Sequence, residues 1–255
     1  MSDWNSAQYL KFKAQRTQPA IDLAARISGE PAEIIDLGCG PGNSTRVLKE
    51  RFPSAHIVGV DSSESMIAAA REGNSDLEFE ILDVSGELSE FSGRFDVVFS
   101  NACLQWIPDH RRLIPKIFGL LKTGGTLGVQ IPMNFDEPIH KIIGRVSGSE
   151  RWRGKVPERI FGTLTAFEYF DILSGLTDDF EIWHTVYCHR MPSVESIIEW
   201  YRSTGLRPYH NALDDSDGAE FVREVYEELS GEYHKQKNGE VIFRFPRFFF
   251  IAKKG

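Results

Sequence analysis

The 255-residue sequence has few cysteines, no long apolar run and no excess of positive charge. Its three cysteines are an odd number without a CxxC pair, which is typical of reduced thiols in the cytoplasm. No apolar stretch approaches the ~18 residues of a membrane span, and the first residues lack the basic and apolar regions of a secretory signal. We therefore expect a cytoplasmic protein with no membrane partner.

Acidic residues outnumber basic ones, so the sequence carries a net charge of -8. Long-range attraction to nucleic acid or to an anionic membrane is therefore not expected. No internal repeat, low-complexity segment or Pro/Gly-rich linker divides the chain. With 41% hydrophobic residues the chain can bury a sizeable core, and we expect residues 1–255 to form a single α/β domain with insertions.

A glycine-rich turn follows the first strongly apolar segment. Residues 34–37 predict a short buried strand and residues 44–52 predict a helix. The alternating glycines between them are Gly38, Gly40 and Gly42. Glycine suits a turn that needs positive φ angles or lets another molecule lie against the backbone. The GxGxG spacing differs from the dinucleotide fingerprint GxGxxG, and no phosphate-binding Lys-Ser/Thr pair follows, so the turn by itself predicts only a nucleotide cradle.

Acidic residues end the next two predicted strands. Asp61 follows the strand at residues 56–60, about 20 positions beyond the glycine turn, where a carboxylate can accept hydrogen bonds from both hydroxyls of a ribose. Asp83 ends the strand at residues 77–82 and can accept a hydrogen bond from the exocyclic amine of adenine. Further strands are predicted over residues 95–100 and 126–131. We expect all these strand ends to share one edge of a parallel sheet.

The order of these motifs resembles that of class I S-adenosylmethionine-dependent methyltransferases. The resemblance is carried by Asp36-Leu37-Gly38-Cys39-Gly40-Pro41-Gly42, Val60-Asp61-Ser62-Ser63-Glu64-Ser65-Met66 and Leu82-Asp83. It implies a doubly wound, mostly parallel seven-stranded sheet of Rossmann-like α/β class, with a cofactor-binding core over about residues 30–131. A helical insertion before the last strand, over about residues 192–240, would cover the substrate.

The same resemblance implies S-adenosylmethionine as cosubstrate and a residue set that holds it. Asp36 and the three glycines should line its methionine and ribose portion, and Asp61 should bind the ribose hydroxyls. The remaining expected cofactor contacts are Ser62 and Met66 beside the adenine, Asp83 and the backbone of Val84 on the adenine edge, and Asn101 near the sulfonium and its methyl group.

Segments outside this core resemble the trans-aconitate 2-methyltransferase family. They lie at residues 2–5, 9–10, 100–106, 189–193, 204–208 and 245–247. This resemblance implies methyl transfer to one carboxylate of trans-aconitate, which gives a monomethyl ester. Carboxylic acids of this kind ionise near pH ~4, so the attacking oxygen is already an anion and needs no general base. We therefore expect no catalytic triad and no metal, and a mechanism that works by proximity and by excluding water.

Arginines are the candidates for binding the carboxylates of the substrate, because a planar guanidinium donates two parallel, charge-assisted hydrogen bonds. Arg207 and Arg247 are the first choices, and Arg16, Arg153 and Arg244 stay open. The aromatic candidates for the pocket wall are Tyr9, Trp106, Trp200 and Tyr201, with Trp106 also expected near the methyl group. At helical spacing Trp200 is more simply a core residue. His184 and His189 lack partners at metal-ligand spacing, which favours packing or hydrogen bonding.

The coarse element pattern beyond the core is less regular. Residues 1–28 are predicted to be helical, with Pro19 starting a second helix. The later expectations are a helix at 166–173, a strand at 180–189, two helices within 192–237 and a last strand at 241–252 broken by Pro246.

Alternative functions have specific signatures. A methyltransferase for a carrier-bound malonyl group would need an exposed basic surface, whereas residues 214–232 are acidic. A non-catalytic nucleotide-binding module would bind S-adenosylmethionine without turnover. A nucleic-acid methyltransferase is disfavoured by the net charge and by the lack of a Pro-Pro-Tyr type motif after residue 100. Neither the oligomeric state nor the range of accepted acids follows from the sequence.

Overall fold

The computed structural model describes residues 13–158, 162–202 and 204–255, which divide into two compact units. The sheet unit comprises the described residues of Leu10–Pro132, Phe161–Thr185 and Phe248–Gly255. The helical unit comprises the described residues of Met133–Ile160 and Val186–Arg247. Two long strands, β6 (Phe180–Met191) and β7 (Val241–Lys253), run from one unit into the other.

The described part of the chain contains a seven-stranded sheet in the order β3-β2-β1-β4-β5-β7-β6. Its first five strands are β1 (Glu33–Leu37), β2 (His56–Asp61), β3 (Glu78–Ile81), β4 (Phe95–Asn101) and β5 (Leu121–Pro132), all paired in parallel. Strand β7 is antiparallel to β5. This follows from two backbone hydrogen bonds, in which Met133 N donates to the Pro246 carbonyl and Lys254 N donates to the Gly125 carbonyl. This confirms the predicted doubly wound, mostly parallel sheet.

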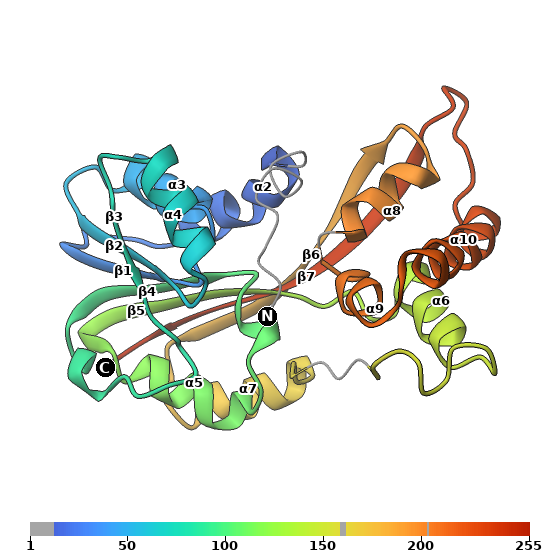
Figure 1. Cartoon of the computed structure of the whole chain (residues 1–255). Coiled ribbons are helices and arrows are strands. Elements are labelled where there is room, and N and C mark those ends of the chain that lie inside the picture. Colours follow the sequence, from blue (N-terminus) through green and yellow to red (C-terminus); the bar gives the residue numbers. More distant parts are fainter. Residues whose placement is uncertain (1–12, 159–161, 203) are drawn as a thin grey trace. The chain divides into compact units, whose positions relative to one another are not determined.

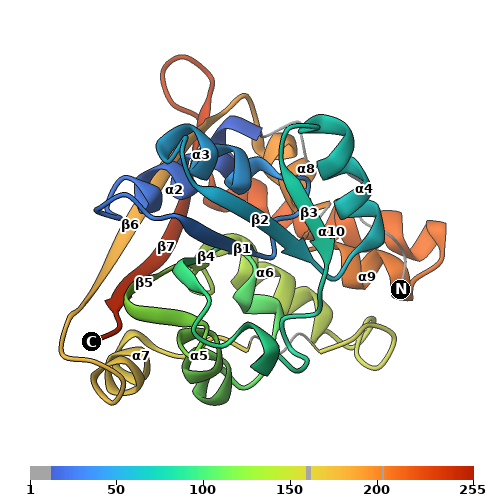
Figure 2. The ribbon, with the colours of Figure 1, turned by 90° about the vertical axis from the view of Figure 1, so that its left-hand side faces the viewer.

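Helices cover both faces of the sheet unit. They are α2 (Lys13–Ala24), α3 (Asn43–Arg51), α4 (Glu64–Gly73), α5 (His110–Phe118) and α7 (Ala166–Ser174). Two short 3₁₀ turns, η1 (Ser89–Phe91) and η2 (Leu104–Trp106), come before and after β4. Figures 1 and 2 show α2 and α3 on one face of the sheet and α5 and α7 on the other. Both faces of β1 and β4 are thereby buried, which explains their nearly continuous apolar sequence.

The helical unit is built around a long acidic helix. Helix α10 (Asp215–Glu232) contacts α6 (Pro138–Ser147), α8 (Val194–Arg202) and α9 (Arg207–Ala212). Helix α6 presents Ile139, Ile142, Ile143 and Val146 as a buried stripe at i, i+3, i+4 and i+7 spacing. No helix in the described part of the chain combines the length and the apolar character needed to cross a membrane.

Three element predictions were wrong in detail. Pro19 lies inside α2 and does not start a helix. The described residues of 192–237 form three helices, because Leu213 is extended and Asp214 caps a new helix by accepting a hydrogen bond from Asp217 N. Strand β7 continues through Pro246, since proline removes only a donor and its carbonyl still accepts from Met133 N at 3.1 Å.

Candidate cofactor and substrate site

The glycine turn after β1 is shaped by both backbone conformation and close packing. Gly38, Gly40 and Gly42 have φ angles of +71°, +54° and +85°, which L side chains rarely adopt. A Cβ on Gly38 would lie 2.1 Å from Cys103 Sγ, and one on Gly42 would lie 2.9 Å from the Phe79 ring. A Cβ on Gly40 would meet no atom within 4 Å. The two outer glycines are therefore required by the protein itself, whereas Gly40 borders open space that a ligand can occupy.

Asp61, at the end of β2, is tied to this turn. Its Oδ2 accepts a hydrogen bond from Gly40 N at 3.0 Å, and its Oδ1 accepts one from Ser63 N at 2.9 Å. The side chain is half-buried, and each carboxylate oxygen has a second lone pair for a further donor. The carboxylate is thus oriented by two backbone amides and can still accept hydrogen bonds from a pair of hydroxyls.

Asp36 lies completely buried beneath the turn. Its Oδ2 accepts hydrogen bonds from Ser44 Oγ at 2.6 Å and Thr45 Oγ1 at 2.7 Å, both at the start of α3. Its Oδ1 is buried and accepts no hydrogen bond from any described residue. Burial raises the pKa of Asp36 to about 6, against the opposing effect of the two hydroxyl groups. A cationic group near Oδ1 would stabilise the ionised form.

Negative charge is concentrated at this edge of the sheet. The pKa of the Cys103 thiol is raised to about 12, first by burial and then by the charges of Asp61 and Asp36. The pKa of Cys39 is also raised, by burial and by the same two carboxylates. A raised pKa favours the protonated thiol, which is a weaker nucleophile than the thiolate. The charges of Asp36 and Asp61, which add to the effect of burial on both thiols, favour a positively charged ligand nearby.

The ends of β3 and the start of α4 complete the predicted cofactor set. Asp83 is exposed, and its Oδ1 accepts hydrogen bonds from Ser85 N at 2.8 Å and Ser85 Oγ at 2.7 Å, which lowers the pKa of Asp83. Val84 is buried, and its carbonyl accepts a hydrogen bond from Lys116 Nζ at 2.9 Å. Ser62 is exposed just before α4 and Met66 is buried in its first turn.

The end of β4 carries polar and aromatic groups. Asn101 is half-buried, and its amide oxygen is buried without a hydrogen bond from the described residues. Trp106, on η2, leaves 46% of its surface exposed. Arg16, on α2, is only 8% exposed. All three belong to the sheet unit.

The parallel register brings the predicted cofactor residues to one edge. In the register of the sheet, Asp36 of β1 pairs with Gly59 of β2 and with Phe99 of β4, and Asp61 pairs with Ile81 of β3. The strand order changes direction between β1 and β4, which is where open α/β sheets bind ligands. The sheet unit therefore gathers these residues: Asp36, Gly38, Gly40, Gly42, Asp61, Ser62, Met66, Asp83, Val84 and Asn101.

The predicted substrate arginines of the helical unit differ in burial. Arg247 is 3% exposed, and its guanidinium lies 4.5 Å from the centre of the Phe245 ring. Arg207 is half-buried at the start of α9. Arg153 is exposed and donates to the Gly148 carbonyl, and Arg244 is exposed beside Glu137. Tyr9 lies outside the described residues.

Aromatic side chains fill the interior of the helical unit. Trp200 is buried and stacks on His189 with ring centres 5.2 Å apart, which supports its interpretation as a core residue. Burial, together with the charge of Arg247, lowers the pKa of His189 to about 4, so this histidine is neutral. His184 packs against Phe248 in the sheet unit.

Tyr201 belongs to a polar group that no local sequence pattern revealed. Tyr201 Oη accepts from Asn134 Nδ2 at 2.9 Å and shares a hydrogen bond with His140 Nε2 at 3.0 Å. Ser44 and Thr45 were also not predicted as hydrogen-bond partners of Asp36. Two hydroxyl residues shortly after a glycine turn are a usable signal, because they can donate to an acid at the end of the preceding strand. Asn134 and His140 had no such local signal.

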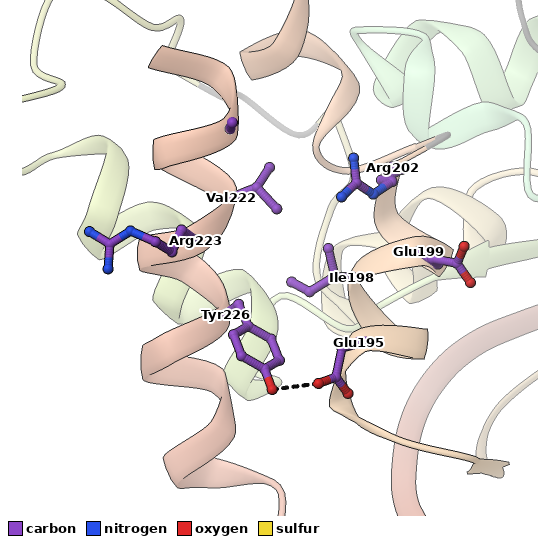
Figure 3. A pocket seen from close by; sticks show the side chains of 8 residues that line it. Glu195, Ile198, Glu199, Arg202, Val222, Arg223 and Tyr226 are labelled. Carbon is purple, nitrogen blue, oxygen red and sulfur yellow. Dashed lines mark hydrogen bonds between the residues drawn. The ribbon is translucent and has the colours of Figure 1, made fainter. Parts of the chain in front are cut away.

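A groove of ≈590 Å³ lies between α8 and α10 (Figure 3). Its lining consists of Glu195, Ile198, Glu199, Arg202, Ala219, Val222, Arg223 and Tyr226. None of these is a predicted site residue, and Tyr226 Oη donates to Glu195 across the groove at 2.5 Å. Among the residues that the structure describes, no group of three or more His, Cys, Asp or Glu side chains is arranged to hold a metal ion.

Comparison with known proteins identifies relatives over the full length of the chain. A family profile described as "Methyltransferase domain" matches residues 34–125. The trans-aconitate 2-methyltransferase of Escherichia coli O7:K1 is 42% identical over 255 residues, covering 100% of this chain and 99% of that protein. The protein of the same name from Shigella flexneri is 41% identical with the same coverage.

Solved structures with low sequence identity share the fold. The YcgJ protein of Bacillus subtilis aligns with a TM-score of 0.61 at 13% identity, covering 95% of this chain and 100% of that one. Phosphoethanolamine N-methyltransferase 2 of Haemonchus contortus, solved with S-adenosyl-L-methionine, aligns with a TM-score of 0.57 at 20% identity, covering 93% of this chain and 53% of that one.

Proposed function

Because the chain belongs to the trans-aconitate 2-methyltransferase family, we propose that it transfers the methyl group of S-adenosylmethionine to a carboxylate of trans-aconitate. The products are the monomethyl ester and S-adenosylhomocysteine. The observation that carries the proposal is 42% identity over the whole chain, beyond the part that the general methyltransferase profile covers. The cosubstrate of this methyltransferase is S-adenosylmethionine.

The cofactor residues have complementary tasks in this proposal. Asp61 accepts hydrogen bonds from the ribose hydroxyls, while Gly40 leaves room for the cofactor against the backbone. Asp36 supplies a buried carboxylate oxygen toward the cationic methionine portion. Asp83 and the backbone of Val84 bind the adenine edge. The concentrated negative charge fits a ligand that carries both a sulfonium and an ammonium group.

The substrate carries the opposite charge and needs cations. A protein with a net charge of -8 must therefore supply positive charge locally. Arg207, Arg247 and Arg16 are the proposed carboxylate ligands, and burial of Arg247 and Arg16 excludes much of the water that would compete with a substrate. Tyr9, Trp106 and Tyr201 are the proposed pocket walls.

The mechanism is in-line displacement at the methyl carbon. The attacking carboxylate is already ionised near neutral pH, so the protein has no proton to remove. Its task is to hold the carboxylate oxygen, the methyl carbon and the sulfur nearly collinear and to exclude water. Asn101 and Trp106 are the residues that we place beside the methyl group. In this proposal residues 1–255 act as one methyltransferase domain, with the cofactor core at 30–131 and a substrate-binding insertion at 192–240.

The direct test is an activity panel. The protein is incubated with S-adenosylmethionine and a set of di- and tricarboxylates, including trans-aconitate, cis-aconitate, isocitrate and citrate, together with a malonyl thioester. Mass spectrometry then identifies any methyl ester. Preferential methylation of trans-aconitate supports the proposal, and methylation of another acid with trans-aconitate untouched refutes it.

A further inference from the structure

A buried histidine and tyrosine in the sheet unit have no part in the proposed cofactor or substrate contacts. His110 begins α5 and Tyr169 lies on α7, and both are 0% exposed. His110 Nδ1 forms a hydrogen bond with Tyr169 Oη. Tyr169 is itself held in place by stacking on Phe248 of β7, with ring centres 5.1 Å apart. The pair thus links α5 to a fixed point on the sheet.

The hydrogen-bond partners define the state of the imidazole. His110 Nε2 lies 2.8 Å from the Leu104 carbonyl oxygen. A carbonyl oxygen can only accept, so Nε2 carries the hydrogen. Burial lowers the pKa of His110 and keeps the ring neutral, so Nδ1 accepts from the Tyr169 hydroxyl. The tyrosine therefore selects the tautomer that donates to Leu104.

Leu104 is the first residue of η2, the turn that carries Trp106. The turn follows Ala102, whose φ of +55° is in the left-handed region and whose N donates to Gln130 of β5 at 3.0 Å. The Leu104 carbonyl accepts from Ile107 N at 2.9 Å as well as from His110. His110 therefore fixes η2 by a contact separate from the one that β5 makes.

We propose that His110 is a positioning residue for methyl transfer, which acts by holding η2 so that Trp106 keeps its place beside the methyl group. Tyr169 acts through His110 by holding the required tautomer. The inference rests on the proposed function, because that function places the methyl group at the end of β4. Displacing a residue that contacts the reactants by about 1 Å can lower the reaction rate ~100-fold without changing the reaction mechanism.

A matched pair of substitutions separates this role from simple packing. In His110→Gln the side-chain amide nitrogen takes the place of Nε2 and still donates to Leu104, whereas the Tyr169 hydroxyl loses its acceptor. In His110→Asn the amide oxygen takes the place of Nδ1 and still accepts from Tyr169, whereas Leu104 loses its donor. Both variants lose the ring, and asparagine leaves the larger void at this buried site, so Tyr169→Phe, which keeps both rings, is the control for lost packing.

The expected result is a difference in turnover between the two variants. His110→Gln should keep the kcat for trans-aconitate within about threefold of wild type, and His110→Asn should lower it about tenfold or more. Affinity for S-adenosylmethionine should be unchanged in both, since its proposed ligands lie on other segments. Equal kcat values in the two variants would overturn the proposal.

Hydrogen exchange gives a readout that does not depend on the substrate. Amides in residues 102–109 should exchange faster in His110→Asn than in His110→Gln, because Trp106 N and Ile107 N form the hydrogen bonds of the turn. Tyr169→Phe keeps the stacked ring and should also speed exchange there. Unchanged exchange in both His110→Asn and Tyr169→Phe refutes the positioning role. If wild type fails to methylate trans-aconitate but the exchange difference appears, the proposed function fails and the role of His110 in holding η2 stands.

Discussion

Removing the carboxylate of Asp61 is the sharpest test of the cofactor site. In the folded protein this carboxylate accepts from Gly40 N at 3.0 Å and from Ser63 N at 2.9 Å, so it is fixed before the cofactor arrives. Hydrogen bonds to a charged group contribute about 1.5 to 3 kcal/mol. Asp61→Ala should therefore weaken binding of S-adenosylmethionine by about 1.5 to 3 kcal/mol, which is roughly a 10- to 150-fold rise in Kd.

Titration calorimetry with wild type and variant measures this difference directly. Asp136→Ala is the matched control, because it removes the same charge from a fully exposed side chain whose partner is Lys141. The control should bind S-adenosylmethionine as wild type does. Thermal unfolding of both variants checks that each is folded. A Kd for Asp61→Ala within about twofold of wild type would refute the assignment of Asp61 to the ribose.

Three further predictions address mechanism, substrate and stability. With trans-aconitate saturating, kcat should be flat from about pH 6 to 9, because the nucleophile stays ionised, and a bell-shaped profile with chemistry limiting would reveal a general base. Arg207→Lys should raise the KM for trans-aconitate and Arg207→Ala should raise it further, because lysine keeps the charge but loses the planar guanidinium. Arg112→Ala, at a 91% exposed side chain, is the control that should leave KM unchanged. Wild-type kinetics in Arg207→Ala would exclude this arginine. The pKa of Asp36 is raised from 3.8 to about 6 by burial, so ionising it costs stability as the pH rises through that interval. Asp36→Asn should therefore stabilise the cofactor-free protein by up to about 3 kcal/mol at pH 8 and by much less near pH 4. Denaturant unfolding at both pH values measures this gain in the free energy of unfolding. An equal gain at the two pH values would show that ionisation of the buried carboxyl is not its cause.

The cofactor half of the fold was predictable because its signals are local. Strands β1, β2 and β4 are short apolar runs ending at or near an acid or amide, and the glycine turn separates β1 from α3. The elements beyond residue 132 were harder. Helix α6 has regular apolar spacing and begins with Pro138, but it has no side-chain cap, so its start was marked by only one of the usual signals.

The sequence by itself determined which polar residues follow which strands, and therefore that Asp36, Asp61 and Asp83 meet at one edge. This holds because parallel strands with crossover helices bring their carboxyl ends to the same side of the sheet. The sequence also determined where glycine was needed, since the turn itself requires positive φ angles.

Only the tertiary structure decided which of these groups are buried and what they contact. The hydroxyl pair on Asp36 is nearby in sequence, but the contact of Tyr169 with His110 spans 59 residues and that of Tyr201 with Asn134 spans 67. Neither contact has a periodicity or a short motif. Such pairs form because burying a polar group is costly unless it finds a partner, and that partner is supplied by whichever element packs against it.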